Sequence, residues 1–270
     1  TPTSVGGRFV TNGSHAIGST EAIDAGLVLA KHYTSALLAS MELEEYHKMA
    51  TVEDEMWYYH VLRRHMWSYL KPHLRTEAVK VLDAGCGTGG LIRYLHAKEP
   101  TWHLTGVDVS PVACELARRR GCPDVIEADL TQLPLATGAY DAVVSSDVLY
   151  HIEDDLLALN ELVRVMRPGG VVVINVPAYR WLWSYHDVAV QSQRRYDRWE
   201  LREKLDTAGL EILKITHWNM LLLPLIVLRR KLLPAPRGGS DVQAYAPWLN
   251  SMLKGVMAIE TALLTTTGYL

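Results

Sequence analysis

This sequence has few cysteines, no net positive charge and no long apolar run. The 270 residues contain three cysteines, with no C-x-x-C pair and no clustered cysteine and histidine at metal-ligand spacing. This predicts reduced thiols, no metal centre and a cytoplasmic location. The formal net charge of -3 disfavours a nucleic-acid partner, because neutralising phosphates requires a basic surface. The longest apolar stretch, residues 220–228, is far shorter than the ~20 residues of a membrane-spanning helix.

Composition divides the chain into three parts. Residues 1–20 are rich in Gly, Ser and Thr and predict a flexible leader, whereas residues 21–40 have the apolar spacing of a helix. Thr51 followed by Asp54 indicates the start of a second helix, which Pro72 should end. We predict a leader and helical cap over residues 1–75, a core over residues 76–218, and a helical addition, in the same domain or as a lid, over residues 219–270.

Short apolar runs alternate with helical patterns throughout the predicted core. The strongest run, residues 171–176, is rich in valine, and Ser110-Pro111 has the composition of a helix start. Such alternation predicts a mainly parallel sheet with helices on both faces, a doubly wound α/β fold. The expected strands cover residues 79–83, 104–108, 125–127, 142–145, 171–176 and 210–215.

Glycines gather directly after the first expected strand, in the run from Asp83 to Gly90. They allow a sharp turn and let a ligand approach the backbone with no Cβ in the way. The run fits both GxGxG and GxGxxG, so it suits either S-adenosylmethionine or a dinucleotide. Asp108 ends the second strand, where a carboxylate can bind both ribose hydroxyls. Asp129 follows the third strand, where a carboxylate can meet the exocyclic amine of adenine.

Five segments in order, VLDAGCGTGG, GVDVS, EADLTQLPL, YDAVVSSDVLYHI and RVMRPGGVVVINVP, resemble the class I S-adenosylmethionine-dependent methyltransferases, specifically the methyltransferase type 11 group. The resemblance spans about residues 79–177. It implies a Rossmann-like fold, S-adenosyl-L-methionine as cofactor and S-adenosyl-L-homocysteine as product. The cofactor-binding residues that it implies are Asp83, Gly85, Gly87, Gly89, Asp108, Val109, Asp129, Leu130 and Asp147.

The segment after Met56 is similar to a tryptophan-rich N-terminal helix in one branch of these enzymes. Such a helix closes over the cofactor, so Tyr58 or Tyr59 could face the sulfonium through its ring. Arg63 or its neighbour Arg64 could pair with the methionine carboxylate. The alternative is an amphipathic helix that buries most of its aromatic residues as core.

Two histidines are candidate catalytic bases. His151 follows the fourth strand, and His186 lies in the aromatic loop after the fifth strand, on the substrate side of such sheets. Either could instead orient a loop or line a pocket. The candidate substrate-binding residues are Tyr59, Tyr150, Tyr185, Arg194 and Arg195, of which the two arginines could bind a carboxylate or phosphate or form a solvated charge pair.

We predict methyl transfer to a small-molecule acceptor, because a helical cap and an aromatic loop would enclose a pocket. Four alternatives remain open. The first two consume S-adenosylmethionine itself, by cyclisation or by aminoalkyl transfer, and release methylthioadenosine. The third is a non-catalytic S-adenosylmethionine-binding subunit, and the fourth a nicotinamide-dependent oxidoreductase. The apolar run from Met220 to Leu233, with its basic residues, favours a packed helix or a homodimer contact over a lid or a membrane-surface contact.

Overall fold

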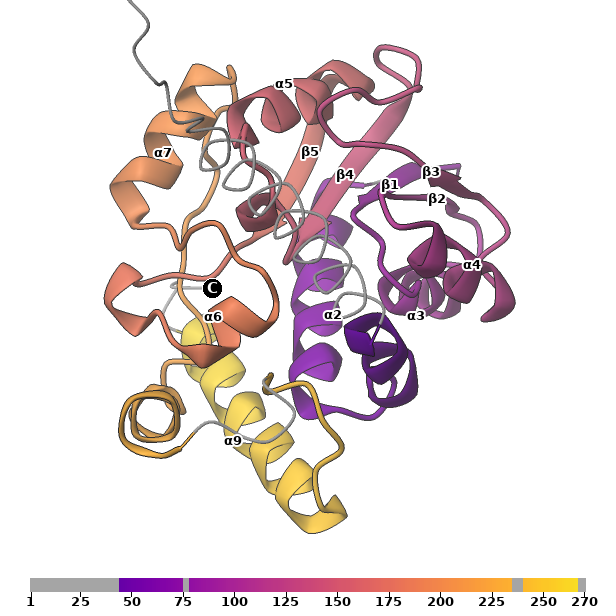
Figure 1. Ribbon diagram of the computed structural model, residues 1–270. Helices are drawn as coiled ribbons and strands as arrows, with labels where there is room; N and C mark the ends of the chain where they lie inside the picture. Colours follow the sequence, from indigo (N-terminus) through magenta and orange to yellow (C-terminus); the bar gives the residue numbers. More distant parts are fainter. Residues whose placement is uncertain (1–43, 75–77, 235–239, 267–270) are drawn as a thin grey trace, which may run out of the picture. The chain divides into compact units, whose positions relative to one another are not determined.

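The computed structural model describes residues 44–74, 78–234 and 240–266 (Figure 1). The predicted leader over residues 1–20 and helix over residues 21–40 lie outside the described residues. None of the helices in the described part of the chain is long and apolar enough to cross a membrane.

Five parallel strands form the sheet, in the order β3-β2-β1-β4-β5 (Figure 1). This order confirms the predicted Rossmann-like α/β fold, in which parallel strands require crossover connections that place helices on the faces. The strands are β1 (Lys80–Ala84), β2 (His103–Asp108), β3 (Val125–Glu127), β4 (Tyr140–Ser146) and β5 (Met166–Asn175).

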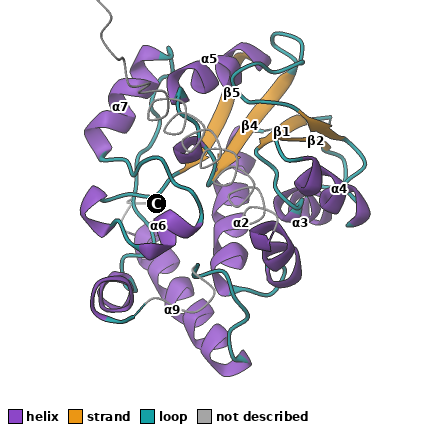
Figure 2. Cartoon of the chain, in the orientation of Figure 1, coloured by secondary structure: helices purple, strands orange, loops and turns teal. Residues whose placement is uncertain are grey.

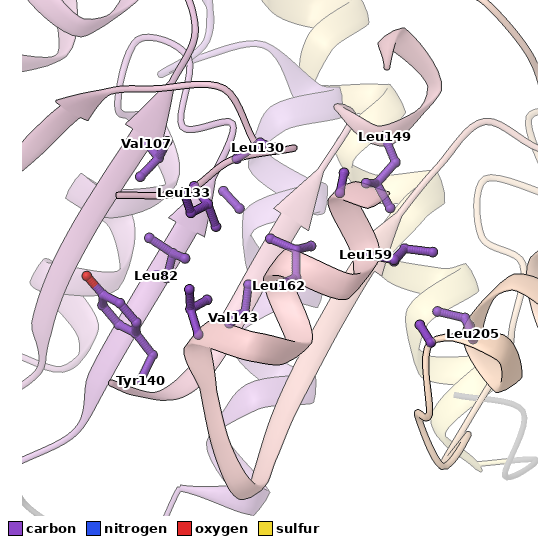
Figure 3. Packing of buried hydrophobic residues seen from close by; sticks show 14 residues of the cluster. Leu82, Val107, Leu130, Leu133, Tyr140, Val143, Leu149, Leu159, Leu162 and Leu205 are labelled. Atoms are coloured by element: carbon purple, nitrogen blue, oxygen red, sulfur yellow. The ribbon is translucent and has the colours of Figure 1, made fainter. Parts of the chain in front are cut away.

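Helices cover both faces of the sheet, because successive strand residues point to opposite sides. Val143 of β4 belongs to a core shared with α5 (Asp155–Val165) and α7 (Arg198–Thr207) (Figure 3). Its neighbour Val144 belongs to a second core, shared with α2 (Trp57–Leu70) and α3 (Gly90–Lys98).

The remaining helices are mostly short and follow β5, where loops make up much of the chain (Figure 2). One exception is α9, which packs against α2 through Leu253 and Met257 in a third apolar cluster. Helical structure before and after the sheet was predicted. The elements not yet given are η1 (Lys71–His73), α4 (Pro111–Arg119), η2 (Leu149–His151), η3 (Arg180–Leu182), α6 (Tyr185–Ala189), α8 (Leu223–Val227), η4 (Leu228–Leu232) and α9 (Pro247–Thr266).

Two local predictions were wrong. Residues 210–215 form no strand, although Leu210 and Ile212 pack against the core beside α7. Their alternating pattern reflects partial burial of Leu210 and Ile212 against the core, and that burial needs no pairing with a sheet. Thr51 does not begin a helix, because residues 44–52 are already helical and its hydroxyl donates to the His47 carbonyl. The next helix, α2, begins after Met56.

Candidate functional site

The glycine loop leaves the carboxyl end of β1 and enters α3. Gly85, Gly87 and Gly89 all have positive φ, at 86°, 52° and 82°, a region that side chains with a Cβ rarely adopt. A Cβ on Gly85 would also lie 2.1 Å from a methyl group of Val148. The loop therefore needs glycine both for its turn and for its close contact with the segment after β4.

Asp108, at the end of β2, holds the glycine loop through its side chain. Its Oδ2 accepts a hydrogen bond of 2.8 Å from the Gly87 amide. Its Oδ1 accepts from the Ser110 amide at 3.0 Å and from the Tyr46 hydroxyl at 3.3 Å. Burial raises the pKa of Asp108, and these hydrogen bonds oppose that rise. The carboxylate is thus fixed in position beside the loop.

Asp83 is the next-to-last residue of β1, just before the same loop, and is only 3% exposed. Its Oδ2 is buried and has no hydrogen-bond partner among the described residues. Burial, and then the charge of Asp108, raise the pKa of Asp83 to about 7. A buried carboxylate of this kind would gain from a cationic neighbour.

A third carboxylate, Asp147, follows β4 and has a positive φ of 59°. It accepts hydrogen bonds from Tyr58 Oη at 2.8 Å and from Asn175 Nδ2 at 2.7 Å. Trp218 Nε1 donates to Asn175 Oδ1 at 2.8 Å, and the Trp218 ring stacks on Tyr58 at a centroid distance of 5.2 Å. Burial raises the pKa of Asp147 to about 6, although the two hydrogen bonds oppose it.

Together these four side chains form a closed ring of contacts, which we call the Asp147 ring. It joins α2 and residue 218 to the ends of β4 and β5. It places the Tyr58 hydroxyl at the carboxyl edge of the sheet, beside Asp147.

Charged residues also link the N-terminal part to the glycine loop. Glu53 is 5% exposed and accepts from Thr88 Oγ1 and Arg120 Nη1. Arg63 is 8% exposed and lies 3.7 Å from the Asp54 carboxylate. Its buried Nε has no partner among the residues described, and a Cβ on Gly90 would lie 2.9 Å from its Nη1. The Arg63 guanidinium therefore lies beside the start of α3, with one donor to spare.

Three residues predicted to bind the cofactor lie just after the ends of β2 and β3, and one of them, Asp129, was predicted to contact adenine. Val109 is 61% exposed, and Leu130 is buried. Asp129 is exposed, and its Oδ1 accepts from both the amide and the hydroxyl of Thr131, each at 2.8 Å. An apolar surface and a fixed carboxylate are thus available at this edge.

The two candidate histidines differ in their hydrogen bonds. His151 Nδ1 lies 3.4 Å from the Gln191 carbonyl oxygen, which can only accept, so Nδ1 carries the hydrogen and Nε2 keeps its lone pair. His186 Nδ1 instead accepts from the Asp241 amide at 3.1 Å, so its Nε2 carries the hydrogen. Burial lowers both histidine pKa values, to about 4 for His186.

The predicted arginine fork is already occupied. Arg195 forms a two-pronged ion pair with Asp187, with N–O distances of 2.6 and 3.0 Å, and both residues are buried. Arg194 pairs with Asp155 at 2.9 Å. The Tyr185 hydroxyl donates to Asp241 at 2.8 Å. These contacts stabilise the loop after β5 and the start of α5. They occupy donors of side chains that were candidates for binding a substrate.

A cavity of about 2030 Å³ connects the glycine loop to the loop after β5. Three of the predicted site residues, Gly89, Tyr185 and Arg194, do not line it. The predicted residues that line it are Tyr58, Tyr59, Arg63, Asp83, Gly85, Gly87, Asp108, Val109, Asp129, Leu130, Asp147, Tyr150, His151, His186 and Arg195.

Several polar residues at this site were not found from the sequence. Asn175 ends β5 and completes the Asp147 ring, and Glu53 contacts the glycine loop across 35 positions of sequence. A polar residue closing an apolar strand was a usable signal for Asn175. No local pattern indicated Glu53, whose partners are distant in sequence.

Comparison with known proteins identifies the domain. Residues 82–174 match the profile of a methyltransferase domain family. A probable S-adenosylmethionine-dependent methyltransferase of Mycolicibacterium smegmatis is 29% identical over 222 residues, 77% of this chain and 80% of the relative. A probable tRNA methyltransferase 9B of Mus musculus is 30% identical over 164 residues, 59% of this chain and 33% of the relative.

Among solved structures, one similar chain comes from a complex of the Trm112 methyltransferase activator with a methyltransferase of Haloferax volcanii. It is 23% identical with a TM-score of 0.55, over 66% of this chain and 77% of that chain. This likeness confirms the fold. The chain spans only a third of the length of the mouse relative.

Proposed function

The chain carries a class I S-adenosylmethionine-dependent methyltransferase domain, and on that premise we propose that it transfers a methyl group to a small-molecule acceptor held in the cavity. The observation that carries the proposal is the continuity of one cavity from the glycine loop to His151. A methyl donor at the loop and an acceptor near that histidine would share one enclosed space.

The charges of the site suit S-adenosylmethionine. Asp83 and Asp147 are carboxylates with raised pKa values, and a sulfonium and an ammonium group would relieve the burial of their negative charge. Arg63 has a buried Nε with no described partner, which suits the ligand's carboxylate. We propose that Asp108 binds the ribose and Asp129 the adenine amine.

The bound cofactor supplies an activated methyl group with a neutral thioether as leaving group. The protein must hold the acceptor in line with the methyl carbon and the sulfur. A side chain of the site would accept any proton that the acceptor loses on methylation.

We assign the base to His151. Its neutral ring keeps a lone pair on Nε2, and its lowered pKa keeps the ring uncharged at neutral pH. His186 would act differently, because its Nε2 carries a hydrogen and can only donate a hydrogen bond. We propose that His186 and Tyr150 orient the acceptor, and that Arg195 acts indirectly by holding the loop through Asp187.

A small-molecule acceptor is favoured over RNA. The formal net charge of the chain is -3, whereas binding of tRNA relies on neutralised phosphates. The probable tRNA methyltransferase among the relatives makes RNA the first alternative to exclude.

The experiment is incubation of the protein with S-adenosylmethionine, alone and with pools of small molecules or tRNA, followed by mass spectrometry of the nucleoside products. We expect S-adenosylhomocysteine only when a small-molecule pool is present. Methylthioadenosine formed without an acceptor would contradict methyl transfer, and product formed only with tRNA would contradict the acceptor class.

Two variants separate the histidine roles. His151→Gln should lower kcat by about 100-fold, the usual size of general-base catalysis, while leaving the affinity for S-adenosylmethionine unchanged. His186→Gln retains a hydrogen-bond donor, so it should mainly raise KM for the acceptor. If His186→Gln instead removes turnover and His151→Gln does not, the assignment is reversed.

A further inference from the structure

Three exposed leucines lie on the helical segment formed by α8 and η4, and a fourth, Leu221, lies in the turn that precedes it. The four recur at intervals of three or four residues, which places the three helical ones on one face. Their side chains are 44–73% exposed, unusually open for a run of large apolar residues. We call this face the leucine stripe; its members are Leu221, Leu225, Leu228 and Leu232.

The adjacent side of the same segment already has an internal role. Leu222 and Ile226 pack with Leu253 and Met257 of α9 in an apolar cluster. The segment is therefore anchored by one face, and the leucine stripe is not needed for that packing. Apolar side chains on two adjacent sides of a surface helix point to a second contact outside the described fold.

Basic and aromatic side chains border the end of the leucine stripe. Lys231 Nζ donates to the Trp183 carbonyl at 2.7 Å, and the Arg229 guanidinium lies 5.4 Å from the Tyr185 ring centroid. Neither Arg229 nor Lys231 forms an ion pair with a residue in the described ranges, whereas Arg230 is neutralised by Asp241 at 2.8 Å. Two cations without an ion-pair partner in the described ranges, beside exposed leucines and an aromatic ring, are the composition of a membrane-interface surface.

The leucine stripe also borders the cavity of the proposed active site. Leu225 and Leu228 line the same cavity as Gly85 and His151. A molecule with an apolar tail could therefore pass from a surface at the stripe to the site while its tail stays in apolar surroundings.

We propose that the leucine stripe docks on an anionic lipid bilayer, and that the acceptor is an amphiphile drawn from that bilayer into the cavity. Charge favours a bilayer as the partner of the leucine stripe. Arg229 and Lys231 complement acidic headgroups, whereas a second copy of this chain would bring the same cations and repel them. The docking surface stands independently, while the acceptor class rests on the proposed methyl transfer.

Co-sedimentation of the full chain with vesicles tests the docking surface. We expect binding to phosphatidylcholine vesicles that contain phosphatidylglycerol, weakened by salt, and much less binding to phosphatidylcholine alone. Leu228→Asp with Leu232→Asp should lower the partition coefficient at least about tenfold, because apolar insertion is lost. Arg229→Gln with Lys231→Gln should lower it about 25-fold on the anionic vesicles only, at roughly fivefold per charge.

Trp199→Asp is the matched control. Trp199 is 78% exposed on α7 and does not line the cavity, and an acidic residue in the first turn of a helix is tolerated. This variant should sediment as the wild-type chain does. Absence of wild-type binding to anionic vesicles would overturn the proposal without reference to any variant. A dimer that Leu232→Asp dissociates, with no vesicle binding, would also overturn it and assign the leucine stripe to a second copy.

The acceptor class has its own readout. With methyl-labelled S-adenosylmethionine and a lipid extract of bacterial membranes, we expect label in the chloroform phase. Label transferred only to water-soluble molecules would overturn the amphiphilic acceptor and leave docking intact. Vesicle binding needs no turnover, so a chain that binds vesicles yet forms no methylated product from any pool refutes the proposed function alone.

Discussion

Asp83→Asn should remove one destabilising contribution to the free energy of unfolding of the ligand-free protein, a contribution that grows as the pH rises. Burial and the charge of Asp108 raise the pKa of Asp83 from an ordinary value near 3.8 to about 7. The folded state therefore favours the protonated carboxyl, and its contribution to stability is lost as the pH rises toward and through 7. Linkage between these two pKa values lowers the free energy of unfolding by about 2–3 kcal/mol between pH 5 and pH 8.

Urea unfolding at pH 5, 6, 7 and 8 measures this effect. As the pH rises, the wild-type midpoint should fall relative to the Asp83→Asn midpoint. The buried histidines, whose pKa values are lowered and whose contribution to stability grows over the same range, are present in both chains. Asp129→Asn, at an exposed carboxylate of the same cavity, should keep the wild-type slope. Equal slopes for wild type and Asp83→Asn would refute the reasoning that burial raises this pKa.

The other predictions concern the cofactor and the loop after β5. The affinity for S-adenosylmethionine should rise from pH 5 to pH 8, and binding should release protons. The reason is that a cationic ligand favours the ionised forms of Asp83 and Asp147, whose pKa values are about 7 and 6. Calorimetry in two buffers measures both the affinity and the proton release, and an affinity that does not change with pH would contradict the prediction. Asn175→Ala removes a hydrogen bond that lowers the Asp147 pKa. The acid side of the curve of affinity against pH should therefore move to higher pH. An unchanged curve would exclude this role for Asn175. Asp187→Ala should lower the free energy of unfolding by about 3–5 kcal/mol, because it leaves the buried Arg195 unpaired. Arg194→Ala should lower it less, since Asp155 keeps two other partners. Equal losses for the two variants in urea unfolding would contradict this difference.

The sequence predicted the fold well where local pattern and tertiary structure agree. The strands from residue 79 to 145 and the turn at Gly85–Gly90 depend on apolar runs and glycines that are contiguous in the chain. Residues 210–215 show the limit, because alternation reports burial of one face and carries no information on strand pairing. Thr51 shows another limit, since a capping pattern can also occur inside the last turn of a helix.

Residues of the site could be predicted from the sequence only where they lie at the end of a strand or directly after it. Asp83, Asp108 and Asp147 each end or follow a strand, so parallel topology brings them to one edge of the sheet. The partners of Asp147 come from positions 58, 175 and 218, and no periodicity connects those positions. The sequence left Arg195 open between a substrate-binding fork and a solvated charge. Its acidic partner, Asp187, lies across a turn whose shape the sequence does not specify.

The buried pair of Arg195 and Asp187 also has an evolutionary consequence. Either residue lost alone leaves a charge in the interior, so selection should remove most single replacements at these positions. Related sequences should therefore retain both residues or replace both together. Exposed neighbouring positions, such as Val188, should vary freely among related sequences. An alignment of this loop should therefore show two covarying positions among variable ones.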